Sequence, residues 1–152
     1  MRMKHLLLIA ATIGILCAGP AQACTALVVS DGERVLVGNN EDWFNPFTRI
    51  WFIQPGNNRH GAVCFGFDDG MIQGGMNEKG LFFDWVAGYR TNWKPTGGKK
   101  TFKGNINIKI MEECATIDDA IKIFRTYDYP SLKYAAIFLA DASGASVIIR
   151  WK

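Results

Sequence analysis

The chain has 152 residues, 49% of them hydrophobic and 20% charged, and a formal net charge of +3 at pH 7. Two of its 17 Lys and Arg side chains lie in the first 23 residues, so the remainder nearly balances the 14 acidic side chains and excludes the basic footprint of a nucleic-acid-binding protein. No run of like charge, low-complexity tract or internal repeat is present, and the length suits one domain or part of one.

The N-terminal segment has the three parts of a secretory signal peptide. Arg2 and Lys4 precede an uncharged run over residues 6–18, and Ala21-Gln22-Ala23 is a small-x-small cleavage site. The run is short for a bilayer span, and no second such run follows. A buried N-terminal helix is the alternative, but the three-part pattern is specific to leaders. The sequence therefore predicts that residues 1–23 are a signal peptide and that the protein is exported, periplasmic or secreted.

The cysteine count is informative for an exported protein. Cys17 leaves with the leader, so that Cys24, Cys64 and Cys114 remain, and an odd number leaves one thiol free or otherwise used. A Cys64–Cys114 disulfide is one arrangement that an oxidising compartment allows. Two buried single thiols are the other.

Strand-forming and turn-forming segments alternate after the leader. Residues 25–29 and 35–37 flank Ser30-Asp31-Gly32, which predicts a hairpin. Further β-rich segments are expected at residues 43–53 (with an interruption at Asn45-Pro46), 62–67 and 81–86. Residues 89–103 contain one proline and two glycines and are expected to form a long surface loop.

The pattern then changes to helices and returns to strands. A first helix is expected at residues 107–115, and Thr116 is suited to N-cap a second, which ends near Tyr127. Its apolar face is Ile117, Ala120, Ile121 and Phe124. Residues 134–140 and 145–151 are expected to form a final hairpin. This order predicts an α+β fold with antiparallel sheets. The last strand ends the chain at an uncovered edge, which favours an incomplete sequence.

The residue inventory narrows the chemistry. Only His60 lies beyond the leader, so a two-His metal site is excluded, and no cysteine pair has zinc-binding spacing. No phosphate-binding glycine motif is present, and we expect neither metal nor cofactor. His60 lies in a polar loop, which favours a solvated histidine over the partner in a Cys–His dyad.

Cys24 needs no histidine if cleavage follows Ala23. It then carries a thiol with a reference pKa of about 8.5 and an α-amine with one of about 7.7–8.0. One residue would supply both nucleophile and base, as in enzymes with an N-terminal nucleophile. The predicted hairpin brings Asp42 near this amine, with Asn40 and Asn39 as amide donors at the same end. The alternative is a polar turn in which these side chains cap backbone groups.

Three motifs carry a family resemblance: CTALVV from Cys24, GNNEDW from Gly38 and GGMNEKGLFFD from Gly74. Together they resemble the N-terminal-nucleophile (Ntn) amide hydrolases of the choloylglycine hydrolase and penicillin V acylase group, linear amide C–N hydrolases. Related acyltransferases and acid-ceramidase-like enzymes share the pattern. The family's opening cysteine and Gly-x-Asn-x-Asp motif match Cys24, Gly38, Asn40 and Asp42.

The resemblance implies an Ntn-hydrolase αββα sandwich, incomplete in this chain, with residues 24–152 as the N-terminal part of the domain. It also implies attack of Cys24 on a non-peptide amide, an acyl-enzyme and an orienting role for Asp42. Such enzymes are about twice this length, and the resemblance implies that the family's second oxyanion asparagine and a later arginine would fall beyond Lys152. Two positions depart from the bile-salt hydrolases: Asn39 replaces an arginine, and Ala87 replaces the first oxyanion asparagine. Backbone groups or Asn77 are then the oxyanion donors.

The partner implied is a small-molecule N-acyl amide, and a homo-oligomer is compatible with the sequence. Trp43 and Phe44 are the best candidates for an apolar acyl pocket, whereas most other aromatic side chains are expected in the core.

Three other functions remain open. A lipoprotein would be diacylated on Cys24 and would act as a tethered binding module, although Ala21 and Gln22 are unusual in that signal. An Ntn cysteine dipeptidase or an acyltransferase would keep the nucleophile. A non-catalytic remnant would keep only part of the fold.

Overall fold

A computed structural model describes residues 24–151, so the predicted signal peptide lies outside the described residues. Two strands, β1 (Thr25–Ser30) and β2 (Val35–Asn40), form an antiparallel hairpin. A six-stranded antiparallel sheet has the order β10-β9-β6-β5-β4-β3. Its strands are β3 (Thr48–Ile53), β4 (Ala62–Phe67), β5 (Ile72–Asn77), β6 (Phe82–Ala87), β9 (Ala135–Ala140) and β10 (Ser146–Ile149).

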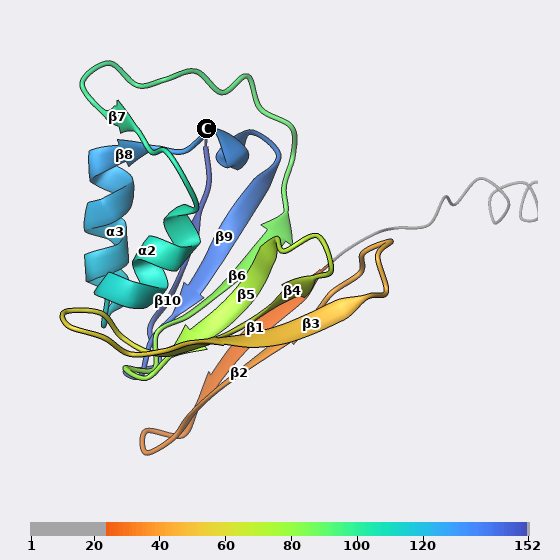
Figure 1. Ribbon diagram of the computed structural model, residues 1–152, viewed down its shortest axis with the longest axis vertical. Coiled ribbons are helices and arrows are strands. Elements are labelled where there is room, and N and C mark those ends of the chain that lie inside the picture. The colour runs from red at the N-terminus through yellow and green to blue at the C-terminus, as the bar shows by residue number, and fades with distance from the viewer. Residues whose placement is uncertain (1–23, 152) are drawn as a thin grey trace, which may run out of the picture.

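Two helices, α2 (Ile106–Glu113) and α3 (Ile117–Thr126), cover one face of this sheet (Figure 1). A short parallel pair, β7 (Lys100–Thr101) and β8 (Tyr127–Asp128), joins the long loop to the end of α3, and a 3₁₀ turn, η1 (Pro130–Lys133), precedes β9. The structure confirms the predicted α+β fold with antiparallel sheets. No helix among the described residues is long and apolar enough to cross a membrane.

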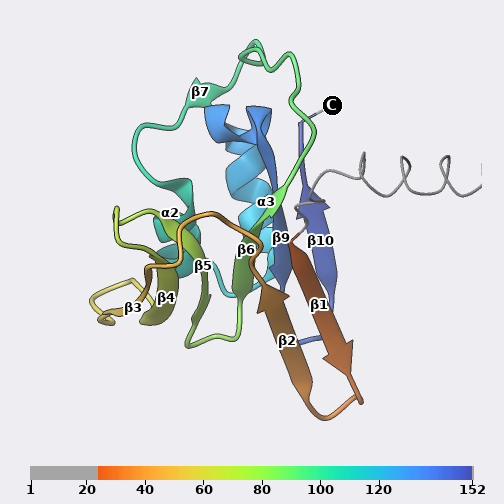
Figure 2. The same ribbon diagram turned by 90° about the vertical axis from the view of Figure 1, so that its right-hand side faces the viewer.

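The alternation of side chains along β6 divides the core into two layers. Phe83 and Trp85 pack with the helices in the larger apolar cluster. Phe82 faces the other way, where it packs with Phe138 and, less fully buried, Val28 of the hairpin. The hairpin therefore lies against the face of the sheet opposite the helices, and it projects beyond the sheet at its turn end (Figure 2). The layers run helices, sheet, hairpin.

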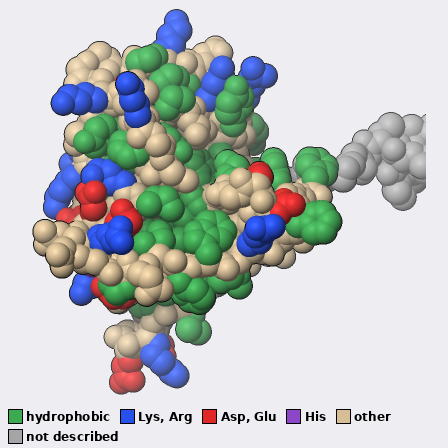
Figure 3. All heavy atoms as spheres, viewed as in Figure 1, with side chains coloured by type: hydrophobic (Ala, Val, Ile, Leu, Met, Phe, Trp, Pro, Cys, Tyr) green, Lys and Arg blue, Asp and Glu red, His purple; other side chains and the backbone are tan. Residues whose placement is uncertain are grey.

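The outward-facing surface of the hairpin and of β3 is apolar as well. Figure 3 shows hydrophobic side chains gathered across the middle of the face seen in Figure 1. The exposed large apolar side chains of the hairpin and β3 are Leu27, Val29, Leu36, Ile50 and Phe52. Because these strands carry apolar residues on both faces, the simple hydrophobic–polar alternation of a one-sided sheet is absent from them.

Most predicted elements are confirmed within a few residues. The strand at residues 62–67 matches β4, and Thr116 caps α3 by accepting from the Asp119 N–H, as expected. The β-rich segment expected at residues 43–53 forms a strand only from Thr48, so the expectation was wrong for Trp43, Phe44 and Phe47, whereas the interruption expected at Asn45-Pro46 is confirmed. Asn45 Oδ1 accepts from the Phe47 N–H at 2.9 Å, which forms a local turn, and the intervening proline has no N–H for a sheet.

Asn77 ends β5 and ties the following turn to α2. Its Oδ1 accepts from the Lys79 and Leu81 N–H groups, each at 3.0 Å. Its Nδ2 donates to the carbonyl oxygens of Met111 at 3.0 Å and Cys114 at 2.7 Å. The side chain is buried, so all four bonds replace water.

We expect Asn77→Ala to lower the free energy of unfolding by about 2–4 kcal/mol, because it leaves buried backbone groups without partners. Chemical denaturation measures the change. Asn92→Ala, in the exposed loop, is the matched control and should stay within about 0.5 kcal/mol of the wild type. Equal stability of the two variants would contradict this structural role.

Candidate active site

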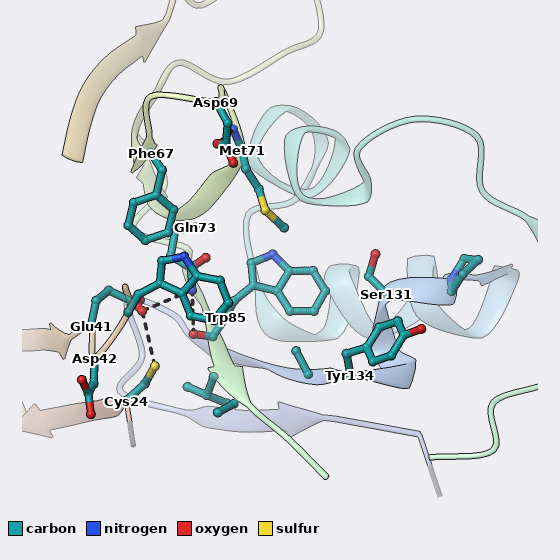
Figure 4. Close-up of a pocket in the computed structure, with 15 residues that line it drawn as sticks. Cys24, Glu41, Asp42, Phe67, Asp69, Met71, Gln73, Trp85, Ser131 and Tyr134 are labelled. Carbon is teal, nitrogen blue, oxygen red and sulfur yellow. Dashed lines mark hydrogen bonds between the residues drawn. The ribbon is translucent and has the colours of Figure 1, made fainter. Parts of the chain in front are cut away.

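The hairpin register decides where Cys24 lies. Thr25 pairs with Asn40 and Ala26 with Asn39, so the residue before β1 lies opposite the residue after β2. The Cys24 thiol accordingly donates to Glu41 Oε2, with an Sγ···Oε2 distance of 3.3 Å (Figure 4). The sequence predicted that the two ends of this hairpin meet, and the register confirms it.

Glu41 is held by two amide side chains. Asn39 Nδ2 donates to Oε1 at 2.9 Å, and Gln73 Nε2 donates to Oε2 at 3.3 Å. Gln73 also reaches the carbonyl oxygen of Trp85 at 3.2 Å. The β4–β5 register advances two residues on β5, from Gly74 to Ile72, for one on β4, so Gln73 is the extra residue of a β-bulge. A bulge re-aims a side chain, here toward Glu41.

The sheet opens beside this bulge. β5 pairs with β6 only over residues 74–76 and 82–84, and beyond that point the Gln73 side chain replaces the main chain in bonding Trp85. β6 remains paired with β9 as far as Ala87. One side of the last residues of β6 is therefore free of a neighbouring strand, and a cavity lies there.

The cavity has a volume of about 470 Å³. Figure 4 shows Cys24 and Glu41 together at one end, Trp85 in the middle, and Ser131 and Tyr134 at the other end. Its lining residues are Cys24, Glu41, Asp42, Trp43, Phe67, Asp69, Met71, Gln73, Trp85, Val86, Ala87, Pro130, Ser131, Tyr134 and Ala135. Within this set no side chain is basic, three are carboxylates, and most of the wall is apolar. The cavity suits a largely apolar ligand that reaches the thiol.

Opposing effects act on the Cys24 thiol. Burial raises its pKa most, and the nearby Glu41 carboxylate raises it further. The backbone N–H groups of Asp42 and Ala87 donate toward the sulfur and lower the pKa, and the net shift is upward. The two backbone donors therefore favour the charged form of the sulfur, but burial and Glu41 outweigh them.

Asp84 is an acidic residue in an otherwise apolar part of β6. Its side chain is 0% exposed, and neither carboxyl oxygen has a hydrogen-bond partner among the described residues. Burial raises its pKa to about 9, and the neighbouring Glu41 contributes to the rise. The Asp84 carboxyl is consequently protonated at neutral pH.

The structure brings some of the predicted site residues together. Cys24, Asp42 and Trp43 all line the cavity. Asn39 bonds Glu41, whereas the side chain of Asn40, one residue along β2, is exposed.

Two other predicted residues lie off the cavity wall. Phe44 is 77% exposed, and its ring centroid lies 5.8 Å from that of Trp43. Asn77 does not line the cavity, because its amide is used by the turn and by α2.

Sequence reasoning missed Glu41, Gln73 and Asp84. The signal for Asp84 was present, since a single carboxyl inside the apolar strand Phe82–Ala87 is unusual. Gln73 carried no signal, because its position depends on a bulge.

The other cysteines and the histidine lie elsewhere. Cys64 and Cys114 are buried free thiols, and burial raises their pKa values to about 11 and about 12. The structure therefore corresponds to the second arrangement considered above, not to the disulfide. His60 Nδ1 lies 3.7 Å from Glu78 Oε1, and His60 is not among the residues that line the cavity. Across residues 24–151, no group of three or more His, Cys, Asp or Glu side chains is placed to hold a metal ion.

Comparison with solved structures identifies the fold. Penicillin V acylase from Agrobacterium tumefaciens aligns over 86% of this chain and 46% of its own, with a TM-score of 0.67 and 19% identity. A variant of conjugated bile acid hydrolase from Clostridium perfringens aligns over 86% and 48%, with a TM-score of 0.58 and 20% identity. The Ntn-hydrolase fold expected from the sequence is thereby confirmed, and the chain spans about half the length of these proteins. No family model matches the sequence, and no curated protein does.

Asp84 generates a prediction on pH. Its pKa of about 9 lies above the ordinary value of 3.8, so the folded state holds one more proton than the unfolded state between about pH 4 and pH 9. Stability is therefore lost as pH rises through this window, by up to about 1.4 kcal/mol per pH unit. Asp84→Asn removes this loss.

We expect the stability advantage of Asp84→Asn over wild type to be smallest near pH 4 and to grow toward pH 9. Denaturant unfolding at several pH values measures it, and groups that titrate in both proteins cancel in the difference. A difference that is constant with pH would contradict a protonated, buried Asp84.

Proposed function

We propose that this protein is an exported amide hydrolase that cleaves a linear, non-peptide C–N bond of an N-acyl substrate through Cys24. One observation carries the proposal: the Cys24 sulfur lies at the end of an apolar cavity of about 470 Å³, beside the backbone N–H groups of Asp42 and Ala87. The likeness in fold to a penicillin acylase and a bile acid hydrolase supports it. The chain spans about half the length of each of these proteins.

Activation of the thiol follows from removal of the leader after Ala23. Cys24 then has a free α-amine, which takes the thiol proton directly or through a water. The raised pKa of the thiol makes such a base necessary, since little thiolate forms unaided at neutral pH. Asp42, which lines the same end of the cavity, would hold the resulting ammonium and orient it.

The bond changes are those of acyl transfer. The sulfur attacks the amide carbonyl carbon, and nearby N–H donors would stabilise the oxyanion that forms. The Ala87 and Asp42 backbone N–H groups, which act on the sulfur, are the candidates for this role. The C–N bond breaks as the ammonium returns its proton to the leaving amine, which leaves a thioester on Cys24. Water, deprotonated by the α-amine, attacks the thioester and releases the acid.

The two asparagines of the motif would act differently. Asn39 bonds Glu41 and so supports the wall of the site. Asn40 pairs with Thr25, the residue after the nucleophile, and so fixes the main chain at the start of β1. Asn77 has its amide fully used in the fold, which favours backbone groups as the oxyanion donors.

The lining indicates the substrate class. Trp43, Phe67, Met71 and Trp85 make an apolar wall that suits an aromatic or aliphatic acyl group. The arginine of the bile-salt hydrolases is replaced here by Asn39, which argues against a bile-salt substrate. We therefore expect small N-acyl amides with an apolar acyl group, with no metal or cofactor required.

We expect Cys24→Ala to lower amide turnover by at least about a thousandfold, because Cys24 is the one cysteine among the described residues that lines the cavity. The assay is amine release from a panel of phenylacetyl, phenoxyacetyl and fatty-acyl amides. Cys24→Ser should retain at most a trace, since a hydroxyl is the poorer nucleophile.

Cys64→Ala and Cys114→Ala are the matched controls, since both thiols are buried away from the cavity. We expect them to keep most of the turnover per folded molecule. Unchanged turnover in folded Cys24→Ala would contradict the mechanism.

A further inference from the structure

Two neighbouring carboxyl groups, one of them in contact with the nucleophile, have no part in the chemistry above. Glu41 accepts a hydrogen bond from the Cys24 thiol at 3.3 Å, and Asp84 lies next to Glu41 with both oxygens unpartnered and 0% exposed. Structural needs alone do not explain a buried carboxyl without donors, because such a group is destabilising.

Three donors converge on Glu41. Cys24 and Gln73 donate to Oε2, and Asn39 donates to Oε1. Gln73 is itself fixed by the carbonyl oxygen of Trp85 and by the bulge in β5. The rotamer of Glu41 is therefore set by the sheet, and the direction of the Cys24 sulfur is set in turn by Glu41.

The sheet leaves room for the Asp84 side chain. Gly74 lies opposite it on β5, and a Cβ atom added at Gly74 would come within 2.9 Å of Asp84 Oδ1 and 2.3 Å of the Phe65 ring. The glycine thus leaves the room that the carboxyl occupies. If Asp84 were ionised, a second negative charge would lie beside Glu41 in a buried place. The Trp85 backbone N–H favours that charge, but burial and Glu41 outweigh it. The pair therefore holds one proton.

We propose that Glu41 and Asp84 act as a one-proton carboxyl pair, in which the charged Glu41 positions the Cys24 thiol and the neutral Asp84 supports Glu41. The role rests on the proposed function of Cys24. The thiol stays hydrogen-bonded to Glu41 until the α-amine takes its proton, and no proton leaves the pair. Glu41 is a positioning residue, because it acts through Cys24 and not on the substrate.

Other titratable groups line the same cavity. They are Asp42 after β2, Asp69 in the turn between β4 and β5, and Tyr134 before β9, at the end away from the thiol. Glu41 differs from these in bonding the sulfur directly.

The test is the rate at which iodoacetamide alkylates Cys24 between pH 6 and pH 9, in the full chain, read at Cys24 by peptide mass spectrometry. Glu41→Gln keeps the size of the side chain and removes the charge, which lowers the thiol pKa. We expect Cys24 to react roughly tenfold faster at pH 8 in this variant than in the wild type. Glu33→Gln, at the far end of the same hairpin, is the control and should react like the wild type.

Asp84→Asn tests the second half of the proposal. It is isosteric with a neutral Asp84, so the Cys24 rate should stay within about twofold of the wild type below pH 8. If Glu41 had only a structural role, the pH profile of Cys24 alkylation would be the same in Glu41→Gln as in the wild type. An unmoved profile, an acceleration in Asp84→Asn equal to that in Glu41→Gln, or no reaction of Cys24 in any variant would each contradict the proposal.

Amide turnover measured on the same samples separates the two proposals. The expected alkylation pattern without turnover of any amide would support the carboxyl pair and contradict the hydrolase function. Amide turnover that depends on Cys24, together with an alkylation profile that is the same in Glu41→Gln and in the wild type, would contradict the carboxyl pair. It would support the hydrolase function.

Discussion

The antiparallel pairing of β1 with β2 is the constraint on which the site depends. Six residues on each strand pair without a shift, from Thr25 with Asn40 to Ser30 with Val35. The residue before the first strand must then meet the residue after the second, and Cys24 meets Glu41. A slip of one residue would turn every side chain of the hairpin to its opposite face. It would also withdraw Val28 from the core and the thiol from the cavity.

The cavity also depends on strand pairing, since it lies where the regular pairing of β5 with β6 stops. The bulge at Gln73 ends the β5–β6 ladder, and a side-chain amide takes over the bond to Trp85. This exchange leaves the end of β6 open, so that the Ala87 backbone N–H lies beside the sulfur. Buried polar groups cluster at this break in the strand pairing. In a regularly paired part of the sheet the same groups would be destabilising. The Glu41–Asp84 pair belongs to this cluster.

The sequence predicted the local structure well and the site in part. Turn residues and alternation located the hairpin, and the Thr116 cap located α3, because these signals act between neighbours in the chain. The motif and the hairpin predicted Asp42 at the same end of the hairpin as Cys24, and both residues line the cavity. Gln73 and Asp84 could not be placed, because their meeting with Glu41 depends on a bulge and on strand order, which no local pattern encodes. The sequence could not decide between a Cys64–Cys114 disulfide and two free thiols, because a count of cysteines says nothing of the distance between them in the fold.

The fold is shared with enzymes that carry acylase and hydrolase activities, at 19–20% identity and over about half of their length. The central claim is that Cys24 opens the mature chain with a free thiol and a free amine. The intact mass of the protein recovered from the exporting cell tests this directly. We expect the mass of a chain that begins at Cys24 and carries no modification there. A mass that retains the first 23 residues, or one raised by a diacylglyceryl group and a fatty acyl chain, would contradict it.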